Sequence, residues 1–331
     1  MEKMFKQSLK LINPQWGKLQ CNNSSLNSLK SLFKGQAYFS LLFFISLQLA
    51  LSQNALVFQS DFGLKDGAVS AMKGVAFAVD SQLPIFDITH DIPPFNIWEA
   101  SYRLAQAAPY WPEGTVFVSV VDPGVGSERK SVVMKSMSGH YFVTPDNGTL
   151  TMVAHLLGVA EVHEIDENTN RLQGSELSHT FHGRDVYAYT GARLASDKIS
   201  FAEVGPKLGN QVELIAYQKA TINGGKLLGN IPILDVNYGN VWTNINRELF
   251  DEFNPDYGDQ FCIIISQNNE SIWEGKAPFV KTFGDVEMGA PLLYYNSLLN
   301  VSLALNWDDF AGKNGIGSGS EWSIEISRCD E

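Results

Sequence analysis

An unbroken apolar run, TVFVSVV at residues 115–121, constrains the fold more than any other feature of this sequence. A strand with one wet face alternates apolar and polar residues, whereas a strand covered on both faces is apolar throughout. Helices packed on both faces of a mainly parallel sheet provide that cover. We therefore predict an α/β domain built around this strand.

Strand and helix patterns alternate along residues 53–206, as such a domain requires. Asn96 and Glu99 form a capping-box pattern ahead of a predicted helix over Ile97–Ala108. A second helix is predicted over 69–79 and a third after His182. Other runs typical of strands are ALVF (55–58), LPIFDI (83–88), SVVM (131–134) and YFVT (141–144).

The pattern changes beyond Pro206, where helical periodicity fades and short strand-like runs recur between turns. We predict that residues 207–331 form a smaller all-β domain, a barrel or a sandwich. The runs that support this are NIPILDV, QFCIII, PLLYYN, VSLAL and EWSIEI.

Residues 1–52 have the pattern of a leader. Lys30 and Lys34 precede the apolar run AYFSLLFFISLQLAL, and Ala50 and Ser52 supply small residues for cleavage. The run is short for a membrane span. We predict an export signal, and hence a periplasmic or secreted protein. An uncleaved membrane anchor is the alternative, and a start site placed too early would leave a cytoplasmic protein.

The charge of the chain bears on its binding partners, and its cysteines bear on metal sites and disulfides. The chain has a net charge of −12 while its first 52 residues hold six Lys against one Glu, so the remainder is strongly acidic. That charge disfavours nucleic acid and anionic membrane surfaces. Cys262 and Cys329 lack the spacing of a metal site, and two cysteines alone do not establish a disulfide.

Acidic residues follow three of the predicted strands: Asp61 the first, Asp91 the second and Asp122 the third. Ligands of parallel sheets bind beyond the carboxyl ends of the strands. No P-loop, zinc-type His spacing or nucleophile elbow occurs, and GVGSER lacks the third glycine of a dinucleotide fingerprint. The pattern indicates a small-molecule site without a metal or a bound cofactor.

Several long motifs in the sequence resemble those of a known enzyme family. The chain resembles the S-adenosyl-L-methionine hydroxide adenosyltransferases, hydrolysing relatives of fluorinating and chlorinating enzymes. The resemblance implies displacement of methionine from the ribose 5′-carbon of S-adenosylmethionine by water, in a homotrimer whose sites join two subunits. The matching motifs are SDFGLKDGAVSAMKGV, DITHDIPPFNIWEA, FVSVVDPGVGSER, PDNGTL, TFHGRDV, DVNYGNVWTNI and APFVKTFGDVEMGAPLLYYNS.

By this resemblance, Asp122, Arg129 and His182 hold the attacking water. The halogenating relatives carry Tyr, Tyr and Ser where this chain has Asp122, His182 and Gly183, which favours water over halide. A halogenase remains an alternative within the fold. An exported protein that binds an adenosyl ligand without turnover is an alternative from another class.

The resemblance also assigns the substrate-binding residues. Asp61 matches a carboxylate for the ribose hydroxyls, Asn240 an adenine-reading amide and Ser297 a contact to the methionine carboxylate. The chain departs from the family at Leu298, where the halogenating relatives have Arg, and in the stretch NWDDFAG. The remaining matches are Asp66 and Asp235 near the methionine ammonium, and the aromatic residues Phe95, Phe181, Tyr238 and Trp242.

Overall fold

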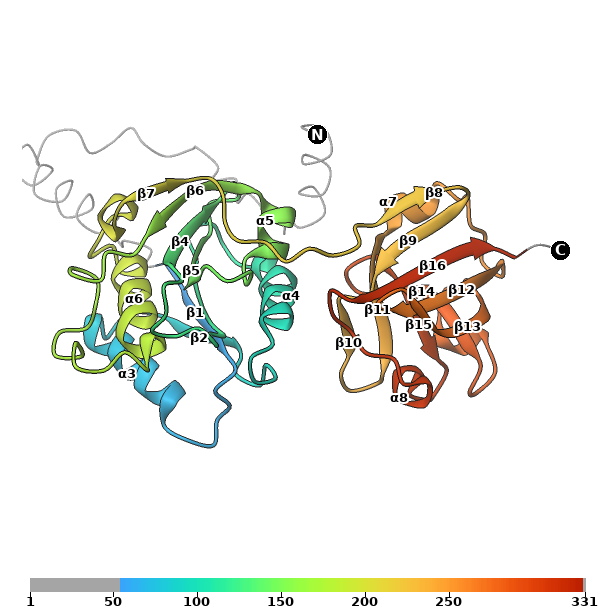
Figure 1. Ribbon diagram of the computed structural model, residues 1–331. Helices are drawn as coiled ribbons and strands as arrows, with labels where there is room; N and C mark the ends of the chain where they lie inside the picture. The colour runs from blue at the N-terminus through green and yellow to red at the C-terminus, as the bar shows by residue number, and fades with distance from the viewer. Residues whose placement is uncertain (1–53, 330–331) are drawn as a thin grey trace, which may run out of the picture. The chain divides into compact units, whose positions relative to one another are not determined.

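The computed structural model describes residues 54–329 of the chain (Figure 1). The predicted leader, residues 1–52, lies outside the described residues. Within the described range, no helix combines the length and the apolar character that a membrane crossing requires.

The N-terminal part is built on a seven-stranded sheet with the order β2-β1-β3-β5-β4-β6-β7. Its first four strands in that order run parallel, while β4, β6 and β7 pair antiparallel with their neighbours. The predicted mainly parallel sheet is confirmed. The strands are β1 (Leu56–Ser60), β2 (Ile85–Thr89), β3 (Val116–Val120), β4 (Ser131–Ser136), β5 (Tyr141–Pro145), β6 (Val159–Glu164) and β7 (Lys207–Gly209).

Helices cover both faces of this sheet (Figure 1). Every residue of β3 is buried, as its apolar sequence predicts. Val118 packs in a core with residues of α3 and α6, whereas Phe117 packs with residues of α4 and α5. The helical segments are α3 (Ala68–Val79), α4 (Ile97–Ala107), η2 (Ala108–Tyr110), α5 (Thr151–Leu157), the π-helical η3 (Gly183–Ala188), α6 (Tyr189–Ala195) and η4 (Phe201–Val204).

The start of α4 follows from its cap. Asn96 Oδ1 accepts a hydrogen bond from the Glu99 backbone N–H at 2.9 Å, and so satisfies a donor that has no partner inside the helix. The Glu99 carboxylate does not complete a capping box, because it accepts hydrogen bonds from the Arg103 guanidinium instead. The buried residues of α4 include Trp98 and Leu104, and Leu104 packs in the same core as Phe117 of the sheet.

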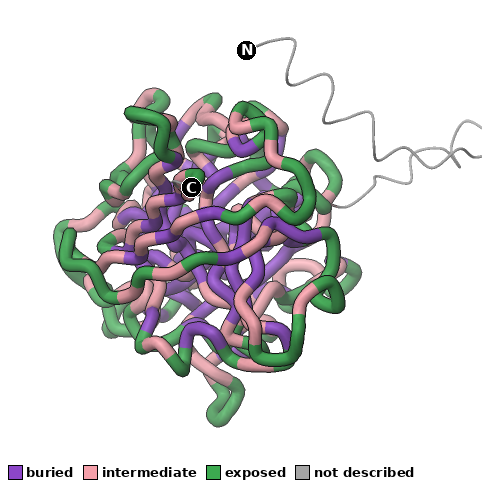
Figure 2. Tube along the Cα trace, turned by 90° about the vertical axis from the view of Figure 1, so that its right-hand side faces the viewer, coloured by how far each residue is buried: buried purple, intermediate pink, exposed green. Residues whose placement is uncertain are grey.

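The C-terminal part consists of two antiparallel sheets, β10-β11-β15-β14 and β13-β12-β16-β9-β8. One core holds residues of both sheets, among them Val241 and Ile263, so the predicted all-β part is a sandwich. Buried segments lie inside and exposed loops outside (Figure 2). Its elements are β8 (Thr221–Asn223), β9 (Lys226–Asn230), β10 (Ile233–Asp235), β11 (Asn240–Asn246), α7 (Arg247–Asp251), β12 (Gln260–Gln267), β13 (Glu270–Pro278), η5 (Phe283–Asp285), β14 (Pro291–Tyr295), β15 (Asn300–Leu305), α8 (Phe310–Asn314) and β16 (Trp322–Arg328).

The first sheet extends past Pro206, the end of the predicted α/β domain. β7 pairs with β6, and Ile215 N–H donates to Thr151 Oγ1 of α5 at 2.9 Å. The first strand of the sandwich, β8, begins at Thr221. The three-residue β7 lies at the edge of its sheet, and so short a strand leaves little periodicity in the sequence.

A disulfide joins Cys262 in β12 to Cys329 just beyond β16. The two strands are neighbours in the five-stranded sheet, so the bond fastens the end of the last strand to the sheet interior. The pairing that the sequence left open is thus present.

Candidate active site

The carboxyl ends of β1 and β3 and the start of η3 meet at one cavity of about 280 Å³. Asp61 follows β1, Asp122 follows β3, and His182 immediately precedes η3. Phe95 and Phe181 complete the set of predicted site residues that line it. Parallel strands end on the same edge of a sheet, which is why residues far apart in sequence converge here.

Arg129 and Asp122 form a buried, two-point ion pair. Arg129 Nε donates to Asp122 Oδ1 at 2.8 Å, and Arg129 Nη2 donates to Asp122 Oδ2. Only 12% of the Arg129 side chain and 5% of the Asp122 side chain is exposed. Burial is the largest single effect and lowers the pKa of Arg129, but the hydrogen bond to Asp122 and the charge interactions with Tyr187, Asp122 and Glu167 together outweigh it, so the pKa of Arg129 is raised. The pair is therefore a fixed, charged unit, of which Asp122 lines the cavity and Arg129 lies behind it.

Two residues that the sequence analysis missed hold this ion pair from behind. The hydroxyl of the fully buried Tyr187 donates to Asp122 Oδ2 at 3.4 Å. Ser131 Oγ lies 3.2 Å from that hydroxyl and accepts from Arg129 Nη1 at 3.0 Å. Burial raises the pKa of Tyr187, so its hydroxyl keeps its proton and remains a donor. Tyr187 directly follows the motif TFHGRDV, five residues after His182, which was the available signal.

His182 joins the ion pair through one ring nitrogen. Its Nδ1 lies 3.3 Å from Arg129 Nη2 and 3.9 Å from Glu167 Oε1. Its Nε2 is buried and has no hydrogen-bond partner among the described residues. Burial lowers the pKa of His182; Glu167 opposes this shift, and Arg129 adds to it. The imidazole is therefore neutral at neutral pH, and its Nε2 is left unpaired among the described residues.

Asp61 holds the loop that carries Phe95. Asp61 Oδ2 accepts a hydrogen bond from the Phe95 backbone N–H at 2.9 Å. Phe95 has a φ of 69°, a left-handed conformation that is rare for a bulky residue, and its side chain is exposed. Strain of this kind persists only where surrounding contacts impose it. Asp61 thus fixes an aromatic ring at the rim of the cavity.

The aromatic wall of the cavity leaves little room beside Gly183. The Phe62 and Phe181 rings meet edge to face with centroids 5.7 Å apart. A Cβ added at Gly183 would lie 3.1 Å from the Phe62 ring and from Val120. Because Gly183 has no side chain, Phe62 and Val120 can pack closely against it at the cavity.

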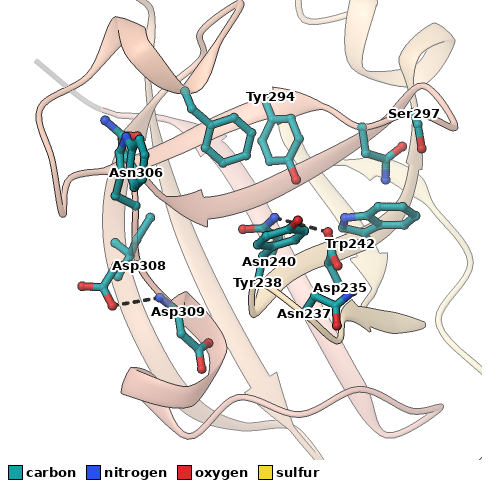
Figure 3. A pocket seen from close by; sticks show the side chains of 14 residues that line it. Asp235, Asn237, Tyr238, Asn240, Trp242, Tyr294, Ser297, Asn306, Asp308 and Asp309 are labelled. Carbon is teal, nitrogen blue, oxygen red and sulfur yellow. Dashed lines mark hydrogen bonds between the residues drawn. The ribbon is translucent and has the colours of Figure 1, made fainter.

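A second cavity of about 790 Å³ lies in the C-terminal part of the chain. Five predicted site residues line it: Asp235, Tyr238, Asn240, Trp242 and Ser297. Figure 3 shows Asn240 beside Asp235, where the amide Nδ2 donates to a carboxylate oxygen at 3.5 Å. The Asn240 amide is almost completely buried, so a ligand can form hydrogen bonds with it in only a few orientations.

The lining residues of the two cavities are different, so each cavity carries part of the predicted set. Asp66 lines neither cavity; its Oδ1 accepts from the Ala68 N–H at 2.8 Å, at the start of α3. Leu298 follows Ser297, and its N–H donates to Asn296 Oδ1. Three aromatic residues that were not predicted also line the second cavity: Phe283, Tyr294 and Trp307.

The donor set does not suit a metal. Over the residues that the structure describes, no group of three or more His, Cys, Asp or Glu side chains is arranged to hold a metal ion. At the first cavity, Asp122 already accepts from Arg129 and Tyr187. The arrangement instead suits a neutral oxygen placed beside a guanidinium, a carboxylate and an imidazole.

Comparison with known proteins gives matches over both parts of the chain. The SAM hydroxide adenosyltransferase N-terminal domain matches residues 56–205, and the C-terminal domain of that family matches residues 229–323. These ranges contain the residues of both cavities.

Individual relatives include hydrolases and a halogenating enzyme. The (R)-S-adenosyl-L-methionine hydrolase of Methanocaldococcus jannaschii is 38% identical, over 68% of this chain and 78% of the relative. A fluorinase of Actinoplanes sp. is 27% identical, over 76% of this chain and 90% of the relative. A crystal structure of an uncharacterized conserved protein from Thermotoga maritima matches with a TM-score of 0.74 and 37% identity, covering 82% of this chain and all of that one.

Proposed function

The chain belongs to the SAM hydroxide adenosyltransferase family, and we propose that it hydrolyses S-adenosyl-L-methionine to adenosine and L-methionine. The observation that carries this proposal is the cluster of Asp122, Arg129 and His182 at the first cavity. Water attacks the ribose 5′-carbon, the bond from that carbon to sulfur breaks, and methionine leaves as a neutral thioether with its electron pair. One proton is released in the overall reaction.

The chemistry explains why the nucleophile is the group that needs help. A sulfonium departs without a general acid because it becomes neutral as it leaves, whereas water is a weak nucleophile at neutral pH. An enzyme gains most by orienting and activating that oxygen in line with the breaking bond. Arg129 stabilises negative charge that develops on the oxygen. Asp122 orients Arg129 through two hydrogen bonds.

His182 is the proton acceptor in this proposal. Arg129 is permanently charged, and both Asp122 oxygens already accept hydrogen bonds. The imidazole is neutral because burial lowers the pKa of His182, and its Nε2 has no partner among the described residues. Proton uptake at Nε2 requires the tautomer in which Nδ1 carries the ring proton and faces Glu167 Oε1, 3.9 Å away, instead of accepting from Arg129 Nη2. In that tautomer, a water at Nε2 meets the only group in the cluster that exchanges protons near neutral pH.

The carboxylate of Asp122 also distinguishes water from halide. A halide ion brought to the cavity would face this anion, and Asp122 already neutralises the guanidinium of Arg129. A neutral water avoids the repulsion. Formation of a chlorinated nucleoside in the presence of chloride would instead support the halogenase alternative.

Substrate recognition divides between the two cavities in our proposal. Asp61 accepts from the ribose hydroxyls at the first cavity, and Asn240 reads the adenine edge at the second. We further propose a homotrimer in which the first cavity of one subunit and the second cavity of its neighbour share one substrate. The separate lining of the two cavities supports this arrangement.

Co-expression of two inactive variants tests the shared site. His182→Ala damages only the first cavity and Trp242→Ala only the second. Mixed trimers should recover about a quarter of the wild-type sites, since each half must come from an intact copy. Activity equal to that of the two variants assayed separately would contradict the shared site.

We also propose that the protein is exported and works without a metal. The disulfide between Cys262 and Cys329 supports an oxidising compartment, where such bonds persist. If the enzyme works without a metal, a chelator should leave its activity unchanged. Loss of activity with the chelator, followed by recovery on adding a divalent cation, would overturn this proposal.

The function itself is tested by incubating the purified protein with S-adenosylmethionine in heavy-oxygen water. Mass spectrometry should find adenosine with the label in its 5′-hydroxyl. Arg129→Ala and His182→Ala should lower kcat far more than they change KM, because both act on the nucleophile. Tight substrate binding with no adenosine formed would favour the non-catalytic binding protein.

A further inference from the structure

Trp307 combines two unfavourable features. Its φ is 61°, in the left-handed region where a bulky side chain is a rare outlier. Trp307 is also 84% exposed, more than any other tryptophan that the structure describes. Exposure of an indole and backbone strain both cost free energy, and neither serves the packing of the sandwich.

The turn that carries Trp307 is held rigidly from both sides. Leu305 and Asp308 form an isolated antiparallel bridge across it. Asn306 is buried; its N–H donates to the Ala290 carbonyl at 3.0 Å, and its Nδ2 donates to the Val286 carbonyl at 2.8 Å. The backbone on either side of Trp307 is thus fixed. The strained conformation is built into the turn.

Trp307 stands at the second cavity together with four other aromatic residues, Tyr238, Trp242, Phe283 and Tyr294. Tyr238 is also strongly exposed, and the buried amide of Asn240 donates to Asp235 (Figure 3). Large planar faces around a hydrogen-bonding amide match a flat heterocycle that has donors and acceptors on its edge.

We propose that Trp307 is a substrate-binding residue whose indole stacks on the adenine ring of S-adenosylmethionine. This inference rests on the proposed function, because it assumes that an adenosyl compound fills the cavity. The strained turn fixes the backbone of Trp307 before the ligand arrives, so the chain does not have to rearrange there on binding. Stacking of a base on an aromatic side chain is a sequence-tolerant contact that every purine can make.

Trp307→Gly separates this role from a structural one. Glycine occupies positive φ without strain, so the variant should unfold at the same temperature as the wild type or at a higher one. Its KM should rise about tenfold with kcat nearly unchanged, because stacking on the base contributes equally before and during the reaction. Trp307→Phe keeps an aromatic face and should show a smaller rise in KM.

Asn269→Gly is the matched control. Asn269 also has a positive φ, 67°, but it lies in the turn between β12 and β13 and lines neither cavity. This variant relieves strain in the same way and should leave KM unchanged. An equal rise in KM for both glycine variants would assign the effect to general loosening and overturn the stacking role.

Binding of adenosine alone keeps the inference separate from the proposed function. Calorimetry should show adenosine binding to the wild type about ten times more tightly than to Trp307→Gly. If the wild type makes no adenosine from S-adenosylmethionine, the proposed function fails, and this comparison still decides the stacking. Equal adenosine affinity, or a change of oligomeric state in the variant by light scattering, would overturn the inference in favour of a contact between subunits.

Discussion

Replacing Asp122 by Asn should destabilise the protein far more than an ordinary surface substitution. The side chains of Asp122 and Arg129 are 5% and 12% exposed, so the variant leaves a buried guanidinium without its counter-ion. One Asn oxygen still accepts a hydrogen bond, but the Asn amino group faces a guanidinium N–H where a carboxylate oxygen stood. Removing one partner of a buried pair costs about 3–5 kcal/mol, and we expect about 3 kcal/mol here.

Urea unfolding of the variant, followed by circular dichroism, measures this free energy. The control is Glu325→Gln, which breaks a pair with Lys226 whose side chains are 26% and 50% exposed. That exposed pair should contribute less than about 1 kcal/mol. The double variant Asp122→Asn with Arg129→Gln should be less destabilised than the sum of the two single variants by at least about 1 kcal/mol. Equal losses for Asp122→Asn and Glu325→Gln, or strict additivity in the double variant, would refute the reasoning.

Three further predictions concern pH, the disulfide and the ribose contact. Burial lowers the pKa of His182 below its usual 6.5, so kcat/KM should be level at neutral pH and fall on acidification as the imidazole takes up a proton; initial rates that rise on acidification would contradict this. Cys329→Ser removes the disulfide to Cys262, which closes a loop of 67 residues. The chain-entropy model gives a loss of about 4 kcal/mol in the free energy of unfolding, which urea unfolding would measure. An unchanged urea midpoint would contradict this prediction. Asp61→Ala should raise KM more than it lowers kcat, and a normal KM in steady-state assays would remove the ribose assignment.

The fold could be predicted where the hydrophobic pattern or a capping residue in the sequence was distinctive. The all-apolar run at 115–121 becomes the fully buried β3, and Asn96 caps α4 as its spacing with Glu99 indicated. The edge strand β7 left no such signal, since it has three residues and pairs on one side only. Cysteine count alone did not establish the disulfide, because the bond depends on β12 and β16 being neighbours.

The site was predictable as a set of positions but not as a geometry. The resemblance marked Asp122, Arg129 and His182, and the structure adds how they touch. Tyr187 and Ser131 were missed because a buried tyrosine and a strand serine look like ordinary core residues until their hydroxyls are placed beside the ion pair. The division between two cavities also depends on the tertiary structure.

The π-helical turn η3 imposes a strict length requirement on this segment. His182 sits just before it and Tyr187 lies within it, and both reach the same ion pair. A π turn accommodates one residue more than an α turn. Deleting one residue between them would rotate the tyrosine around the helix axis by roughly a quarter of a turn, since a π turn holds more residues than the 3.6 of an α turn. Engineered homologues therefore need to keep the residue count of this segment as well as His182 and Tyr187.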